Sequence, residues 1–207
     1  MKKGIIIGFV VILMVVAIAV FGYFRVLATE QNKVEGAIAE IFTSLKSNDD
    51  NSQKQEVMEQ IDNVFNSENS TKSTMDEIGI FDKLNYSIIE SKVNFNEANV
   101  YLDITNKDMK KILENYLTKA LKIAIENAFN EDYSEEQMNE ELRNYLKSQI
   151  ESDEVENITT KITLNMEKRD GKWVIKEECK KDLINAVLPG LADVNNRINE
   201  SISQNAN

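Results

Sequence analysis

Residues 158–175 read ITTKITLNMEKRDGKWVI and hold the clearest local pattern in the chain. Apolar side chains recur at every second position, which is the period of a β-strand with one buried face. These apolar positions are Ile158, Ile162, Leu164 and Met166. Asp170-Gly171 is a two-residue pair typical of a hairpin turn whose twist matches its strands. The stretch therefore predicts an antiparallel strand pair.

The turn also fixes which side chains share a face of this hairpin. Counting back from Asp170-Gly171 pairs Lys168 with Trp173 and Met166 with Ile175. Trp173 and Ile175 then lie on the same face as Met166 and Leu164, in agreement with the alternation. We expect these side chains to line a core or a pocket, together with two tyrosines of an earlier hairpin. The candidates are Leu164, Met166, Trp173, Ile175, Tyr86 and Tyr101.

A second hairpin is predicted upstream of this one. Tyr86 and Ile88 fall on one face of its first strand, and Ile89, Val93 and Phe95 on the other. The residues 96–99 (NEAN) are expected to form a longer connecting loop. In the second strand, Val100, Leu102 and Ile104 alternate with Tyr101, Asp103 and Thr105.

Helical spacing of apolar residues occupies most of the remaining chain. We expect helices over about 29–46, 53–66, 109–128 and 134–150, and another from 183 that Pro189-Gly190 interrupts. The stripe of the helix from 109 comprises Met109, Ile112, Leu113, Tyr116, Leu117, Ala120, Leu121, Ala124 and Ala128. Ile123 and Ile125 fall outside this stripe. The helix is therefore expected to contact neighbours on two sides.

The N-terminal residues predict a membrane anchor. Residues 4–24 (GIIIGFVVILMVVAIAVFGYF) carry no charge, and a helix of this length spans roughly 30 Å, the thickness of a bilayer core. Lys2 and Lys3 favour a cytoplasmic N-terminus of residues 1–3. A single-pass signal-anchor would then place residues 29–207 outside the cell as one α+β domain.

A cleaved secretory signal is the alternative for the same segment. Val26-Leu27-Ala28 offers small residues at the positions that signal peptidase requires, with cleavage after Ala28. The apolar run is longer than usual for such a signal, which favours the uncleaved anchor. A lipoprotein is excluded because the acylated cysteine would follow the apolar run directly, and the single cysteine is Cys179.

Composition excludes several classes of function. The chain contains no histidine and one cysteine, which removes histidine bases, Ser-His or Cys-His nucleophiles, intramolecular disulfides and thiolate metal clusters. Its net charge is −11, and residues 26–207 hold 21 basic and 35 acidic side chains, a net −14. Such a surface repels nucleic acid. We expect no nucleic-acid partner, no cofactor and no metal.

Four stretches together resemble a known family. They are residues 84–88 (LNYSI), 98–108 (ANVYLDITNKD), 170–175 (DGKWVI) and 183–191 (LINAVLPGL). Their order resembles the uncharacterised extracytoplasmic domains of Gram-positive bacteria, often lipoproteins, with an NTF2-like, cystatin-like α+β fold. The resemblance covers roughly residues 30–192. It implies a curved antiparallel sheet packed on helices, and it implies no catalytic or ligand-binding residue.

Other candidate groups have plain explanations. The acidic pairs Glu135-Glu136, Glu140-Glu141 and Glu177-Glu178 lack the spacing of a calcium loop, and adjacent carboxylates diverge on a helix. Cys179 follows two glutamates, which disfavour its thiolate. We expect both features to be inert.

The sequence thus predicts a non-catalytic binding or interaction module of the bacterial envelope. Its partners are the lipid bilayer through residues 4–24 and either an envelope protein or a small apolar ligand in the sheet concavity. The alternatives are a structural subunit of an envelope or secretion assembly and a hydrolase or isomerase that uses the cone pocket. The pattern favours no particular oligomeric state.

Overall fold

The computed structural model describes residues 25–47, 78–130, 132–191 and 193. Its strands are β1 (Asn85–Asn94), β2 (Glu97–Lys107), β3 (Asn157–Arg169) and β4 (Lys172–Ile175). Its helices are residues 25–46, α4 (Met109–Glu126), α5 (Glu135–Glu151) and α6 (Glu177–Val187). The predicted α+β class is confirmed.

The four strands form one antiparallel sheet in the order β1-β2-β3-β4. Met166 pairs with Ile175 and Lys168 with Trp173, which is the predicted register. Asp170 and Gly171 both have positive φ, 50° and 77°, as a two-residue turn of type I′ requires. The short turn therefore set the register of the hairpin correctly.

The β1–β2 hairpin differs from its prediction in two ways. Its turn is the pair Phe95–Asn96, not a loop over 96–99, because Glu97 already pairs with Asn94. The register also shifts between Ile88 and Glu90, so that Ile89 forms a bulge. This extra residue returns Val93 to the face of Tyr86 and Ile88, whereas strict alternation had placed it on the opposite face.

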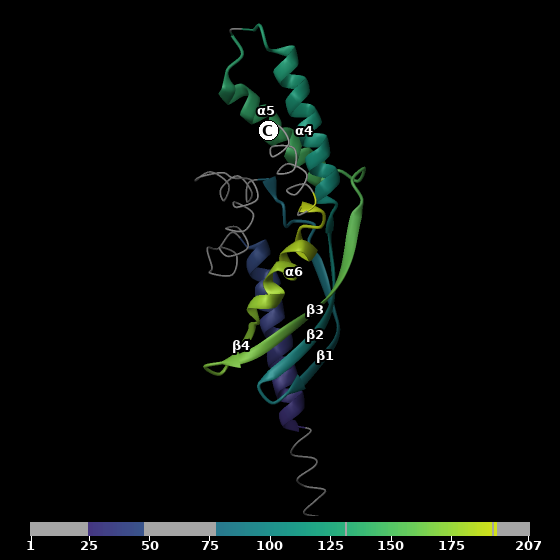
Figure 1. Ribbon diagram of the computed structural model, residues 1–207, viewed down its shortest axis with the longest axis vertical. Coiled ribbons are helices and arrows are strands. Elements are labelled where there is room, and N and C mark those ends of the chain that lie inside the picture. Colours follow the sequence, from purple (N-terminus) through teal and green to yellow (C-terminus); the bar gives the residue numbers. More distant parts are fainter. Residues whose placement is uncertain (1–24, 48–77, 131, 192, 194–207) are drawn as a thin grey trace, which may run out of the picture.

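One face of the curved sheet is covered by the helix at 25–46 and by α6 (Figure 1). The helix at 25–46 buries the predicted stripe Val34, Ile38, Ile41, Phe42 and Leu45. These side chains pack with the inward residues of the strands and with Leu183, Ala186 and Val187 of α6 in a single apolar core. The opposite face of the sheet carries mostly polar side chains, threonines prominent among them.

Helices α4 and α5 form a hairpin that projects beyond one end of the sheet (Figure 1). The first turns of α4 reach the main core, where Met109, Ile112 and Leu113 are buried. Further along, Leu117 and Leu121 are exposed, so their predicted inward position is wrong. The sheet ends before these residues, and among the described elements α4 packs there against α5 with its opposite side.

Two buried polar side chains at the end of β2 join the sheet to its surroundings. The Asn106 amide nitrogen donates to the carbonyl oxygens of Ile80 and Val187, at 3.3 and 2.8 Å. The Lys107 ammonium donates to those of Ser152 and Val155, at 2.6 and 2.8 Å. Asn106 thus holds the turn at 78–83 and the end of α6, and Lys107 holds the segment between α5 and β3.

None of the helices that the structure describes is both long and apolar enough to cross a bilayer. The predicted span at 4–24, the predicted helix at 53–66 and the tail beyond residue 193 lie outside the described residues. Ala28, the predicted cleavage point, lies exposed within the helix at 25–46.

Candidate functional site

The hairpin of α4 and α5 carries a continuous row of exposed apolar side chains. Leu117, Leu121, Ile125 and Phe129 are 49%, 63%, 66% and 99% exposed. The first three recur at intervals of four residues along about 12 Å of α4, and Phe129 follows in the turn just after the helix ends at Glu126. Ala124 and Ala128 are exposed beside them. We call these six residues the α4 stripe.

Leu117, Leu121 and Ile125 lie on the side of α4 that faces away from α5, whereas Ala124 is at the edge of the stripe and lines a cavity together with Met138 of α5. Asn115, Lys119 and Ile123 mark the opposite side, since Asn115 and Lys119 bond to α5 and Ile123 is buried. Each of them lies two residues from a stripe residue, which is about 200° around an α-helix. The helix therefore contacts α5 on one side, through polar side chains and Ile123, and among the described residues nothing covers the apolar row on its other side.

Polar contacts hold the two helices of the hairpin together. The Asn115 amide donates to Gln149 at 2.7 Å, and the Lys119 ammonium lies 2.6 Å from the Glu141 carboxylate. The Tyr133 hydroxyl donates to the same carboxylate at 3.1 Å. The Lys119 ammonium lowers the pKa of Glu141, and Glu141 in turn raises the pKa of Lys119. These contacts fix the stripe on a defined two-helix support.

Both helices of the hairpin begin at a side-chain cap. Asp108 accepts from the Lys111 backbone nitrogen at 3.1 Å. Ser134 and Gln137 form a reciprocal capping box at the start of α5. A cavity of about 180 Å³ lies at the tip, lined by Ile123, Ala124, Asn127, Tyr133, Ser134, Glu135 and Met138. The two caps fix the first residues of α4 and of α5, the helices that form the hairpin.

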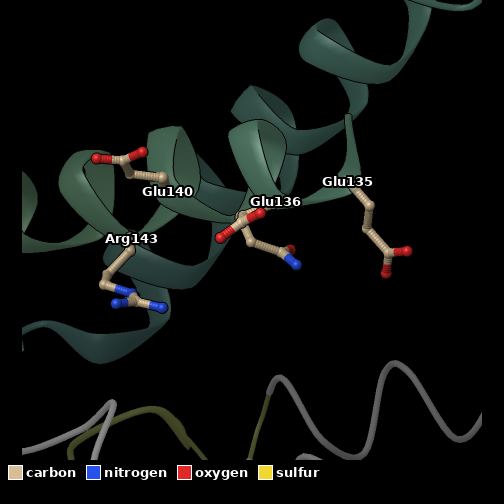
Figure 2. Close-up of a pocket in the computed structure, with 5 residues that line it drawn as sticks. Glu135, Glu136, Glu140 and Arg143 are labelled. Carbon is tan, nitrogen blue, oxygen red and sulfur yellow. The ribbon is translucent and has the colours of Figure 1, made fainter. Parts of the chain in front are cut away.

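A larger cavity of about 590 Å³ lies along the first turns of α5. It is lined by Glu135, Glu136, Asn139, Glu140 and Arg143. Figure 2 shows the carboxylates of Glu135, Glu136 and Glu140 pointing in different directions instead of converging. In the part of the chain that the structure describes, no three potential metal ligands gather into a site. The cavity therefore has a polar lining of three carboxylates, one amide and one guanidinium.

The inward residues proposed from the second hairpin lie in the core. Leu164 and Met166 are fully buried, and Trp173 is 7% exposed. Tyr86 and Ile175 are half-buried against the same core, and the Tyr86 ring stacks on Phe42 with centroids 4.1 Å apart. The helix at 25–46 and α6 therefore occupy the concave face on which an apolar ligand was expected.

Tyr101 is not brought together with these residues. It pairs with Glu90 and Thr163 on the outer face of the sheet, and the Lys92 ammonium lies 5.0 Å from its ring centroid. Alternation along β2 places Tyr101 opposite Val100 and Leu102, which face the core.

A polar cluster ties the helix at 25–46 to the β3–β4 hairpin. The Glu30 carboxylate accepts from the Lys168 ammonium at 2.7 Å, the Lys33 ammonium at 2.8 Å and the Trp173 indole nitrogen at 3.1 Å. These donors, Lys168 first, lower the pKa of Glu30 to about 2. We call Glu30, Lys33, Lys168 and Trp173 the Glu30 cluster. It explains why Trp173 is fixed in one orientation.

Cys179 is buried in α6, and its sulfur accepts from the Asn165 backbone nitrogen at 3.4 Å. It lies within the core cluster, where it packs as a small apolar side chain. Burial keeps its sulfur away from solvent reagents.

The α4 stripe was not named as a site from the sequence. Its signal is in the sequence, however, because the predicted apolar row contains Leu117, Leu121, Ala124 and Ala128, and Ile123 and Ile125 outside that row imply contacts on two sides. The structure assigns Ile123 to the contact with α5 and leaves Ile125 exposed. The sequence could not show which of the two sides would remain open.

The chain matches no protein-family model and no curated protein. Its fold is similar to the crystal structure of ycdA from Bacillus subtilis subsp. subtilis str. 168, described as "a putative lipoprotein". The TM-score is 0.51 at 13% sequence identity, and the match covers 75% of this chain and 56% of that chain. This chain thus spans little more than half of the length of ycdA. At this identity the likeness shows a shared α+β fold.

Proposed function

We propose that the protein is a non-catalytic interaction module of the bacterial envelope, anchored by residues 4–24 and exposed outside the cell. The α4 stripe is its docking surface, and the occupant is an amphipathic helix of another envelope protein. The fold is of the NTF2-like, cystatin-like kind, which the curved sheet around the helix at 25–46 supports. The likeness to ycdA, described as "a putative lipoprotein", supports the placement of this domain outside the cytoplasm.

The observation that carries the proposal is the exposure of four large apolar side chains in one row. Single exposed apolar residues are ordinary, but a continuous row at helical spacing is typical of helix-in-groove recognition. Leu117, Leu121 and Ile125 are each about half or more exposed on a hairpin whose other side is already packed. Burial of this row by a partner helix would remove apolar surface from water.

Charge favours a different protein over a second copy as the occupant. Residues 26–207 carry a net −14, so two copies repel each other at long range. Beside the stripe, Lys111 is exposed and Lys122 lies 3.7 Å from the Glu126 carboxylate, so both signs of charge border the apolar row. A partner helix without an acidic excess avoids the repulsion that a second copy would meet. The absence of histidine from the chain supports a module without acid–base chemistry near neutral pH.

Site-specific photo-crosslinking in cells tests this proposal. A photoreactive phenylalanine at Ile125 should give one discrete adduct with an envelope protein. The substitution Leu121→Lys should abolish that adduct while the thermal unfolding midpoint stays unchanged. Thr163, on the polar outer face of the sheet, is the matched control position and should give no such adduct.

Mapping of the adduct decides the outcome. Peptides from a helical segment with apolar residues at intervals of three and four support the proposal. An adduct of two copies of this chain would show that the stripe mediates self-association instead of binding another protein. Adducts with several different proteins would indicate that the chain is a subunit of an envelope assembly. The same adduct from Thr163, or an adduct that Leu121→Lys leaves intact, would overturn the proposed surface.

A further inference from the structure

Phe95 occupies an unusual position at the tip of the β1–β2 hairpin. Its φ is 53°, in the left-handed region that bulky residues rarely adopt, and its side chain is 81% exposed. Asparagine or glycine would fit this turn position without strain. A strained and exposed aromatic residue is stabilising neither the turn nor the core. Such positions occur where the side chain meets a ligand or another surface.

The hairpin tip lies at the end of the domain where the helix at 25–46 begins (Figure 1). The Lys168 backbone nitrogen donates to the Asn96 carbonyl oxygen at 2.8 Å, and the Lys168 ammonium bonds Glu30 at 2.7 Å. Glu30 is five residues after residue 25, about 7.5 Å along a helix axis. Contacts therefore place the turn next to the start of this helix, which directly follows the apolar segment 4–24.

Further exposed side chains at this end have the character of a membrane interface. Val26 is 62% exposed on the first turn of the helix at 25–46. Lys92, Arg169 and Lys172 are exposed near the two strand turns, and two of them are ion-paired: Lys92 with Glu90 at 2.9 Å and Arg169 with Glu167. Aromatic and aliphatic side chains flanked by Lys and Arg are typical of the headgroup region of a bilayer.

We infer that Phe95, together with Val26 on the first turn of the neighbouring helix, inserts into the headgroup region of the bilayer that holds the anchor. The domain then contacts the membrane through the tip of the β1–β2 hairpin as well as through the anchor. We call this second contact the seating of the domain. The α4–α5 hairpin projects from the opposite end of the sheet, so this seating points the α4 stripe away from the lipid (Figure 1). The inference rests on the proposed membrane anchor.

Lipid photo-crosslinking of the full-length protein in phosphatidylcholine nanodiscs tests this seating. A photoreactive phenylalanine is placed in turn at Phe95, Phe129 and Ile89. Phe129 is a matched control, because it is also an exposed phenylalanine but lies in the turn between α4 and α5. The hairpin of these two helices projects from the opposite end of the sheet (Figure 1). Ile89 is an exposed apolar residue on the bulge of β1. The expected result is at least about a fivefold excess of lipid adduct at Phe95 over both controls.

The variant Phe95→Asn tests whether Phe95 serves membrane contact or the stability of the fold. Asparagine accepts the left-handed conformation, so this variant should unfold at the same or a higher temperature than the wild type. A clear fall in its unfolding temperature would assign Phe95 to fold stability and overturn the inference. Equal lipid adducts at Phe95 and Phe129 in inserted protein would overturn the seating and leave the anchor intact. Failure of the protein to enter nanodiscs would overturn both.

Discussion

The ammonium of Lys168 lies 2.7 Å from the carboxylate of Glu30, although 138 residues separate the two in sequence. Both side chains are largely shielded from solvent, and the same carboxylate accepts from the Trp173 indole at 3.1 Å. The Lys168 ammonium also lies 5.8 Å from the centroid of the Trp173 ring. This pair joins the helix at 25–46 to the last hairpin of the sheet.

The Glu30 carboxylate should make stability depend on acid pH. Its pKa is lowered from 4.5 to about 2 in the folded protein, so its contribution is present above pH 4.5 and is lost as the pH falls through 2. Glu30→Gln should reduce the free energy of unfolding by about 1–2 kcal/mol at pH 7. Denaturant titrations of the full-length protein in mild detergent should show the two proteins converging between pH 5 and pH 2.

Glu40→Gln is the control, because Glu40 is an exposed carboxylate of the same helix. It should change the unfolding free energy at pH 7 by less than about 0.5 kcal/mol. A Glu30→Gln deficit that is the same at pH 2 and pH 7 would contradict the role of the charged carboxylate.

Trp173 should contribute to stability through both its ring and its indole nitrogen. Trp173→Ala should cost about 3–5 kcal/mol, because the ring is buried. Trp173→Phe keeps most of the ring but removes the hydrogen bond to Glu30, and should cost about 1–2 kcal/mol. In a double-mutant cycle, Trp173→Phe and Glu30→Gln should be non-additive, since they share one contact. Strict additivity would show that the hydrogen bond contributes nothing measurable.

Asn106 should be sensitive to substitution because it joins two segments within the core. Asn106→Ala would leave the buried carbonyl groups of Ile80 and Val187 without this donor, at a cost of about 2–3 kcal/mol. Thr105→Ala is the neighbouring control, since its hydroxyl contact with Thr159 is exposed, and it should cost less than about 1 kcal/mol. Equal losses from the two variants in thermal unfolding would argue against this role for Asn106.

Gly190 and Gly171 provide a matched pair for backbone and steric effects. Both have positive φ, 84° and 77°, but a Cβ on Gly190 would lie 2.6 Å from the Lys110 Cβ, whereas Gly171 has open space. Gly171→Ala should cost about 1 kcal/mol from conformation alone. Gly190→Ala should cost a further 1–3 kcal/mol or so, since it presses on the first turn of α4. Indistinguishable unfolding midpoints would mean that this close approach is easily relieved.

Truncation of two apolar residues of α4 should reduce the free energy of unfolding by very different amounts. Ile123→Ala should cost about 2–4 kcal/mol, because Ile123 is buried against α5. Leu121→Ala should cost less than about 0.5 kcal/mol in the isolated protein, because Leu121 is 63% exposed. A large loss from Leu121→Ala would show that the stripe is covered within the chain itself and is not available to a partner.

The sequence by itself determined the local elements whose geometry depends on near neighbours. The Asp170-Gly171 turn fixed the register of β3 and β4, and the amphipathic spacing of the helix at 25–46 fixed which of its side chains are buried. Both follow from the repeat of the backbone, two residues in a strand and 3.6 in a helix. Alternation also placed Trp173 correctly on the face of Leu164 and Met166.

Tertiary structure alone decided the features that depend on distant segments. The bulge at Ile89 places Val93 on the face opposite to the predicted one. Pairing with β2 accommodates one extra residue in β1, and the alternation of apolar residues in the sequence does not reveal it. Leu117 and Leu121 match the apolar period of α4 but extend beyond the sheet, so no described neighbour covers them. The Glu30 cluster likewise required the fold to bring together groups 138 residues apart. A periodic pattern shows which side of a helix is apolar, but only the arrangement of the other elements shows whether that side is buried.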